Sequence, residues 1–179
     1  MSAIEQNART QPVAPAGELG AEQFKFLFRQ HPAGVCVITA AGAEGPYGFT
    51  ATSVISVSAA PPVLAFSVAA GSSAWRHLQD TETLVVNFLD AEVADLSTRF
   101  ARRGVDRFDG VDTCTLESGE PALVQAAAWT RGLIEQRTPA GDSFLITVRA
   151  LSCRVSRSGR PLVYHDRSYH GLGEHSAIE

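Results

Sequence analysis

Hydroxyl-bearing side chains recur along residues 48–62, whose sequence reads GFTATSVISVSAAPP. If this segment forms one strand, alternation sends four hydroxyl groups to one face and apolar side chains to the other. The four residues are Thr50, Thr52, Ser56 and Ser58. Small uncharged hydroxyls suit contact with a flat polar ligand or a phosphate, although serine and threonine are also common on ordinary strands. The pattern therefore fits either one wall of a binding site or a plain strand.

A phosphate group needs several hydrogen-bond donors and a positive charge, and two further segments offer them. Ser72 and Ser73 stand where a helix can begin, so their hydroxyls either cap that helix or contact a phosphate. Arginines follow later in the chain at Arg99, Arg102, Arg103 and Arg107. Arg102 and Arg103 also fit a solvated loop surface.

Several other chemistries find no support in the residue pattern. A doubly wound dinucleotide-binding domain carries the fingerprint GxGxxG, and the glycines within residues 42–48 have the wrong spacing for it. The three cysteines lie far apart and form no CxxC pair, so we expect reduced thiols without a catalytic role. Three histidines recur every five residues, which suits neither one helix face nor one strand face, so we expect no metal site. They are His165, His170 and His175.

Length and composition favour a single domain, because 179 residues with 45% apolar content can bury one compact core. We place the domain at residues 18–173, between a flexible N-terminal tail (1–17) and a C-terminal tail (174–179). The net charge of −4 is interspersed along the chain, so we expect no nucleic-acid partner. No apolar run approaches the roughly 20 residues of a membrane-spanning helix, and the N-terminus lacks a secretory signal pattern. We therefore expect no membrane contact and a cytoplasmic location.

The elements that must position these residues are mostly strands. Strands are predicted at residues 35–41, 48–60, 63–68, 83–88, 128–137, 143–155 and 161–165. Helices are predicted at residues 21–30, 73–79 and 91–101, the last with Asp90 as its cap. Tight turns join the strands, and no parallel crossover unit is evident. The sequence thus predicts a mainly β fold, an antiparallel Greek-key barrel with a few short flanking helices.

Five sequence blocks occur in order across nearly all of residues 24–172. They are HPAGVCVITA (31–40), GFTATSVISVSAAPP (48–62), SSAW (72–75), RFARRGVDRFDGV (99–111) and GRPLVYHDRSYHGL (159–172). In these blocks and their order, the chain resembles the flavin reductase family of FMN-binding split β-barrels. The resemblance implies a split barrel that binds FMN, or FAD in its place, and uses NADH or NADPH.

The resemblance also implies roles for individual residues. Hydride passes directly between the cofactors, so no catalytic side chain is required. His165 and Tyr169 are implied to contact the nicotinamide, and Arg107 is expected to pair with the flavin phosphate. The implied flavin-binding residues are Thr50, Ala51, Thr52, Ser53, Ser56, Val57, Ala65, Phe66, Ser67, Ser72, Ser73, Phe100 and Arg107.

For partners, the resemblance implies a homodimer and a separate monooxygenase that receives the reduced flavin. Two other functions remain open at this point. One is a non-enzymatic split-barrel protein that carries or senses flavin or haem. The other is an oxidase of the pyridoxamine-phosphate type, although the sequence has no further basic set for a second phosphorylated substrate.

Overall fold

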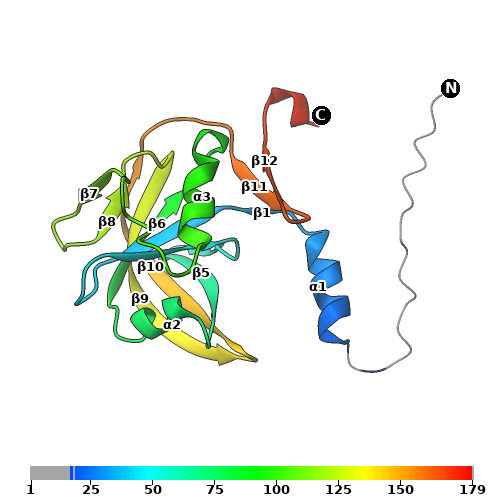
Figure 1. Ribbon diagram of the computed structural model, residues 1–179, viewed down its shortest axis with the longest axis horizontal. Coiled ribbons are helices and arrows are strands. Elements are labelled where there is room, and N and C mark those ends of the chain that lie inside the picture. The colour runs from blue at the N-terminus through cyan, green and yellow to red at the C-terminus, as the bar shows by residue number, and fades with distance from the viewer. Residues whose placement is uncertain (1–16, 18, 179) are drawn as a thin grey trace.

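The fold is dominated by one sheet of seven strands, which forms the body of the molecule in Figure 1. It is seen in a computed structural model that describes residue 17 and residues 19–178. The strand order is β3-β2-β6-β9-β10-β5-β4, and every neighbouring pair is antiparallel. The strands are β2 (Cys36–Ala40), β3 (Tyr47–Ala51), β4 (Ile55–Ala59), β5 (Pro62–Ala69), β6 (Thr83–Phe88), β9 (Ala128–Ala140) and β10 (Ser143–Val155). The predicted mainly β, antiparallel fold is confirmed.

The two edge strands of this sheet, β3 and β4, follow each other directly in the chain. Only residues 52–54 join them, and so short a link reaches on the order of 10–15 Å. The sheet must therefore curve until its two edges approach each other at this link. No ladder between β3 and β4 closes the sheet within the described residues.

The prediction of one continuous strand over residues 48–60 is wrong. The chain leaves the ladder after Ala51 because it must cross from one edge of the sheet to the other, and it pairs again from Ile55. The predicted single row of hydroxyls is wrong for the same reason. Thr50 belongs to β3, whereas Ser56 and Ser58 belong to β4, with a register shift between them.

Both faces of β2 are covered, and this divides the core into two parts. Ile38 points into the concave side of the sheet with Phe66 and Ile146, whereas Val37 points to the other side with Phe100. All five residues of β2 are buried. A strand buried on both faces has no need of polar alternation, which explains the continuous apolar run in this part of the sequence.

The helices beside the sheet begin where the sequence predicts. α2 (Ser73–Leu78) is capped by Ser72, whose Oγ accepts a hydrogen bond from the Trp75 N–H at 3.1 Å. Asp90 accepts a bond of 3.1 Å from the Glu92 N–H and begins a 3-10 turn (Ala91–Val93) that leads into α3 (Ala94–Ala101). The predicted helix at residues 91–101 is thus confirmed, with a 3-10 first turn.

Two small sheets were not predicted, because their strands are too short to show a period. One contains β1 (Ala33–Gly34), β11 (Leu162–His165) and β12 (Ser168–Gly171), and the other contains β7 (Thr113–Thr115) and β8 (Pro121–Leu123). Only β11 falls on a predicted strand. A 3-10 turn at Glu174–Ser176 lies in the expected C-terminal tail, and the expected N-terminal tail lies outside the described residues except for residue 17.

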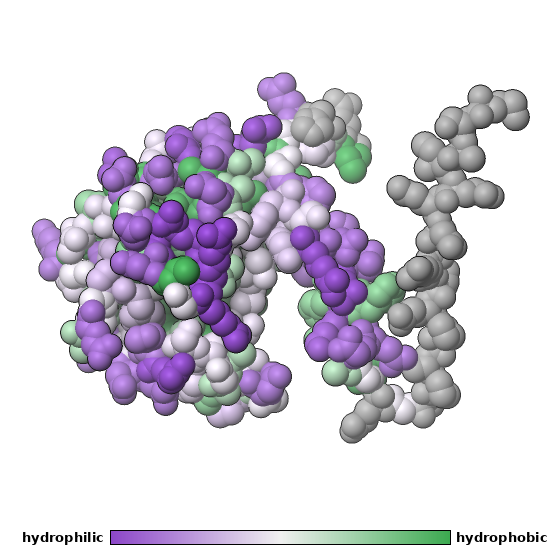
Figure 2. Space-filling model, in the orientation of Figure 1, coloured by the Kyte–Doolittle hydropathy of each residue, from purple (hydrophilic) through white to green (hydrophobic). Residues whose placement is uncertain are grey.

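The first helix, α1 (Ala21–Arg29), extends away from the sheet (Figure 1). Phe24, Leu27 and Phe28 share one side of it and are 50%, 58% and 53% exposed. Figure 2 shows apolar surface along this helix. The predicted helix is confirmed, but its apolar side is not covered by the described part of the same chain. Among the described residues, none of the helices is long and apolar enough to cross a membrane.

α3 lies against β3 with very little room at Gly48. A Cβ built on Gly48 would lie 2.7 Å from Phe100 Cε1 and 3.0 Å from the Ile38 carbonyl oxygen. Phe100 is completely buried, so its ring cannot swing into solvent. The close approach of helix and strand therefore requires glycine at position 48.

Replacing Gly48 with alanine should destabilise the fold by about 1–3 kcal/mol, the usual cost of forcing an extra methyl group into a packed core. Urea unfolding followed by tryptophan fluorescence measures this change. Gly34→Ala is the matched control, because a Cβ at Gly34 meets nothing within 4 Å. Equal unfolding midpoints for the two variants would show that α3 is not held this closely.

Candidate functional site

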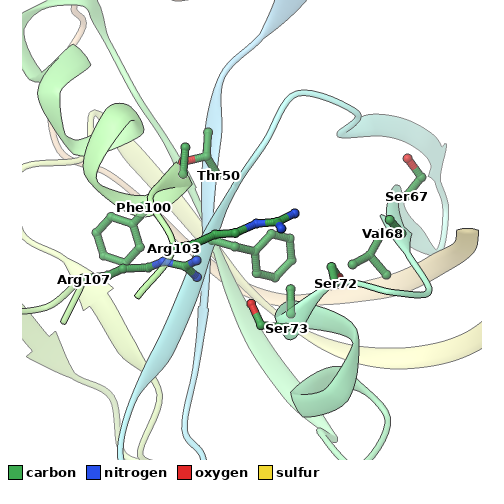
Figure 3. A pocket seen from close by; sticks show the side chains of 12 residues that line it. Thr50, Ser67, Val68, Ser72, Ser73, Phe100, Arg103 and Arg107 are labelled. Atoms are coloured by element: carbon green, nitrogen blue, oxygen red, sulfur yellow. The ribbon is translucent and has the colours of Figure 1, made fainter. Parts of the chain in front are cut away.

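A cleft of about 300 Å³ lies where β3, the end of β5, the start of α2 and the end of α3 meet (Figure 3). The volume is at the lower end of the roughly 300–1,000 Å³ typical of ligand pockets. Its lining includes hydroxyl, apolar and cationic side chains. The lining residues are Phe49, Thr50, Ser67, Val68, Ala69, Ser72, Ser73, Ala74, Phe100, Ala101, Arg103 and Arg107.

The serine side of the cleft is fixed by the start of α2. Trp75 of α2 stacks on Phe144 of β10 with ring centroids 3.6 Å apart, which holds the helix against the sheet. The Ser72 oxygen already accepts the Trp75 N–H, so its own proton stays available for a ligand. Ser73 adds a second hydroxyl beside it (Figure 3). This side of the cleft can donate hydrogen bonds to an acceptor-rich group.

The opposite side is fixed by α3 and its bond to β3. Thr50 Oγ1 donates to the Ser97 carbonyl oxygen at 2.6 Å. The single hydroxyl proton of Thr50 is thereby occupied, so toward a ligand this side chain can only accept. Phe100, one turn further along α3, contributes the edge of a buried ring.

Arg107 is held in place by main-chain oxygens. Its Nε donates to the Arg102 carbonyl at 2.8 Å and its Nη1 to the Gly48 carbonyl at 2.6 Å. Burial lowers the pKa of the Arg107 guanidinium, and the charge of the neighbouring Arg103 lowers it further. The side chain remains a cation whose charge these neutral carbonyls do not cancel.

Arg103 provides the second cation of the cleft (Figure 3). Within the described residues, neither Arg103 nor Arg107 forms a salt bridge with a carboxylate. Two neighbouring cations without a counter-ion repel each other, and an anion between them and the serines would remove that repulsion. The arrangement suits a phosphate group.

Six of the residues predicted to bind flavin line this cleft together. They are Thr50, Ser67, Ser72, Ser73, Phe100 and Arg107. The sequence leaves Arg103 open between a phosphate contact and a solvated loop surface, and does not place it among the flavin-binding residues, because a loop arginine beside other arginines has no distinguishing pattern. Of the other arginines, Arg99 donates to the Asp109 carbonyl, and neither Arg99 nor Arg102 lines the cleft.

The remaining predicted flavin contacts do not line the cleft. Ala51, Ala65 and Phe66 are buried in the core at 6%, 2% and 0% exposure. Thr52 and Ser53 lie on the link between the edge strands, where Ser53 Oγ accepts the Ser67 N–H at 3.0 Å. Ser56 and Val57 are on β4, and Ser56 lines a different hollow that also contains Phe88.

The two predicted nicotinamide contacts lie on the C-terminal hairpin formed by β11 and β12. Neither His165 nor Tyr169 lines the cleft. Tyr169 is nevertheless linked to it, because Ser97 Oγ donates to the Tyr169 hydroxyl at 2.6 Å. The His165 and His170 rings lie 6.0 Å apart across the hairpin.

Among the described residues that line the cleft there is no histidine, cysteine, aspartate or glutamate. It therefore offers no general acid or base and no activated nucleophile of the usual kind. What it offers is an anion site at one end and a mixed apolar and hydroxyl surface beyond it. The site is suited to holding a ligand that brings its own reactivity.

Comparison with known proteins gives a consistent set of matches. Residues 28–173 match the family model described as a flavin reductase like domain. NADH:FMN oxidoreductase of Rhodococcus qingshengii is 38% identical over 157 residues, which cover 84% of this chain and 81% of that protein. HsaB, the reductase subunit of a flavin-dependent monooxygenase of Mycobacterium tuberculosis, is 26% identical over 159 residues, covering 88% and 85%.

Solved structures give similar matches. A flavin reductase domain protein from Arthrobacter sp. FB24 superposes with a TM-score of 0.81 at 36% identity, covering 85% of this chain and 95% of that one. The NADH:FAD oxidoreductase SgcE6 of Streptomyces globisporus, in complex with NAD and FAD fragments, has a TM-score of 0.81 at 26% identity. That match covers 87% of this chain and 94% of the other.

If the paired arginines hold a phosphate, Arg107→Ala should weaken FMN binding by about 1.5–3 kcal/mol, or on the order of ten- to a hundredfold in Kd. Arg107→Lys should recover only part of the loss, since lysine keeps the charge but not the fork. Titration of flavin fluorescence measures both. Arg102→Ala is the control, because that exposed side chain lies outside the cleft. Unchanged affinity in a folded Arg107→Ala protein would contradict the assignment.

Proposed function

The chain belongs to the flavin reductase family, and we propose that the cleft between β3, α2 and α3 is its flavin site. The protein is an NAD(P)H:flavin oxidoreductase, as the NADH:FMN oxidoreductases and other flavin reductases among its relatives support. The observation that carries the site is the pair Arg103 and Arg107, with no carboxylate partner in the described residues, facing Ser72 and Ser73.

The donors of the cleft fit the phosphate end of FMN. A phosphate monoester carries about −1.5 to −2 charge at neutral pH and has three acceptor oxygens. Arg103 and Arg107 supply the compensating charge, and the Ser72 and Ser73 hydroxyls supply further donors. These donors support a phosphate-binding role for this end of the cleft.

The rest of the flavin then extends along β3 and the end of β5. Thr50 can accept a hydrogen bond from a ribityl hydroxyl or a ring N–H, because its own proton is bound to Ser97. Phe49, Val68 and Phe100 give apolar contact to the ring system. Flavin contacts of the remaining seven residues stay predictions; they are Ala51, Thr52, Ser53, Ser56, Val57, Ala65 and Phe66.

When bound, the flavin supplies the ring that accepts hydride from the reduced nicotinamide, which is the cofactors' own chemistry. The side chains hold the phosphate and orient the ring. FAD can use the same donors through its pyrophosphate, and one structural neighbour is named an NADH:FAD oxidoreductase.

The finer architecture is also part of this proposal. We propose that the curved sheet is the split barrel of the family, with its opening between β3 and β4. The three-residue link between the two edge strands supports this, because it brings both edges of the sheet together. A Greek-key order of strands is consistent with the observed neighbours, in which β2 pairs with β6 and β6 pairs with β9.

We further propose that the protein is a homodimer in the cytoplasm and that a separate monooxygenase takes up the reduced flavin. The exposed apolar side of α1 supports the dimer, since a second copy would cover it. Relatives that are reductase subunits of monooxygenases support the second partner. Reduced flavin that leaves the cleft is the species such a partner consumes.

Purified protein should oxidise NADH or NADPH in the presence of FMN much faster than free FMN alone, measured by the loss of absorbance of the reduced nicotinamide. Running the assay without oxygen, with flavin bleaching as the readout, separates hydride transfer from reoxidation. Tight flavin binding with no nicotinamide oxidation above background would instead support a carrier or sensor.

The dimer predicts a solution mass of twice the 19.1 kDa chain in light scattering after size-exclusion chromatography. Phe24→Glu combined with Phe28→Glu should shift the protein to the monomer, because charged groups cannot be buried unpaired. Lys25→Ala, on the same helix, is the control. A monomeric wild type at all concentrations, or a double variant that stays dimeric, would contradict the role of α1.

A further inference from the structure

The C-terminal end of α2 is held by three side chains that do not line the cleft. Arg137 of β9 donates through Nε to the Leu78 carbonyl at 2.8 Å and through Nη2 to the Thr81 carbonyl. The Thr81 hydroxyl donates to the His77 carbonyl at 2.8 Å. The Tyr47 hydroxyl of β3 is bonded to the same Thr81 oxygen. We call Arg137, Thr81 and Tyr47 the C-terminal clamp of α2.

The direction of the bond between Tyr47 and Thr81 follows from the available protons. The single proton of the Thr81 hydroxyl is donated to His77, so Tyr47 must donate to Thr81. Burial raises the pKa of the Tyr47 hydroxyl, so this proton is retained at neutral pH. The Tyr47 ring also stacks on the His77 ring, with centroids 4.6 Å apart. One residue of β3 thus contacts both the last turn of α2 and the loop that follows it.

The clamp supplies what so short a helix lacks. α2 contains six residues, which is fewer than two turns, and a helix of this length does not persist without tertiary contacts. The last carbonyls of any helix have no partner within the helix itself. In α2 the carbonyls of His77 and Leu78 are bonded instead by Thr81 and Arg137. The clamp therefore completes the last turn.

Packing holds the body of the same helix against the sheet. Trp75 stacks on Phe144, and Ala74 and Leu78 are buried in the core. Apolar contacts of this kind are non-directional, whereas hydrogen bonds fix the direction of the groups that they join. The core contacts therefore keep α2 on the sheet, and the clamp adds a directional restraint at one end.

The other end of α2 forms the serine side of the cleft (Figure 3). Because the helix has fewer than two turns, disorder in its last turn reaches the first turn, where the Ser72 oxygen accepts the Trp75 N–H. The clamp is attached to β3 at Tyr47, and the next residue is Gly48, whose carbonyl anchors Arg107. The serine side and Arg107 are thus tied to adjacent residues of one strand.

We infer that Arg137 and Tyr47 are positioning residues for the flavin phosphate and act through α2 on Ser72 and Ser73. The inference rests on the proposed function, in which these serines and the paired arginines hold the phosphate. Hydroxyls that are already in place lose little freedom when the ligand binds, so the affinity for the phosphate depends on the clamp. In the same proposal the flavin ring lies along β3 and the end of β5, so its contacts do not depend on the clamp.

The test compares the Kd of FMN with that of riboflavin, which lacks only the phosphate, by titration of flavin fluorescence. In Arg137→Met the Kd of FMN should rise about three- to tenfold and that of riboflavin less than about twofold, since ordinary hydrogen bonds are lost at the phosphate end alone. Tyr47→Phe keeps the aromatic ring and removes one bond, so the Kd of FMN should rise about two- to fivefold. General damage to the cleft would instead weaken the binding of both ligands.

Arg76→Met is the matched control for Arg137→Met. It removes the same charge from α2 itself, but the Arg76 side chain is exposed and lies outside the cleft. The Kd of FMN should therefore stay near the wild-type value. An equal rise in this control would show that lost charge rather than lost positioning weakens FMN binding, and it would overturn the inference.

An unchanged Kd of FMN in the two clamp variants would overturn the inference, as would an equal rise for FMN and riboflavin. If Arg137→Met does not fold, the same two results in Tyr47→Phe decide the matter. These outcomes leave the flavin site intact as long as the wild type binds FMN more tightly than riboflavin. A wild type that binds both equally would overturn the proposed phosphate site, and the inference with it.

Discussion

The contact between Phe100 and Gly48 is the constraint on which the rest of the site depends. Because Gly48 has no side chain, the buried ring can lie almost on the backbone of β3. That distance brings the Ser97 carbonyl within reach of Thr50 and the Gly48 carbonyl within reach of Arg107. A helix held further away would leave the arginine without its anchor and the cleft without one wall.

Elements with a strong local signal were predictable from the sequence, and those set by distant pairing were not. The caps Ser72 and Asp90 mark helix starts through bonds to residues two or three positions away, so their signal lies within one short segment. The break after Ala51 is set by pairing with two distant strands, β2 and β5, and within residues 52–54 only the pair Ser53 and Val54 departs from the alternation. β12 was missed because its pairing with β11, rather than its composition, makes it a strand.

The same distinction applies to the candidate site. Residue type pointed to Ser72 and Ser73, and the family resemblance singled out Arg107 among the arginines; all three line the cleft. Residue type could not show that Ala65 and Phe66 face the core, because a strand covered on both sides has no polar face to reveal its orientation. Nor could it select Ser97, an ordinary helical serine whose partner lies 72 positions away in the sequence.

The carbonyl anchors of Arg107 also bear on how a ligand reaches the cleft. When a guanidinium is paired with a carboxylate, the two charges cancel and the pair produces almost no electric field at a distance. A guanidinium held by neutral carbonyls keeps its net positive charge, and its field extends into the solvent. With Arg103 beside it, this charge forms a local positive region on a chain whose net charge is −4. The net charge of the chain repels an anionic ligand while this positive region attracts it, so the electric field favours diffusion toward the cleft. Added salt screens that field, so the association rate of an anionic ligand falls as the ionic strength rises.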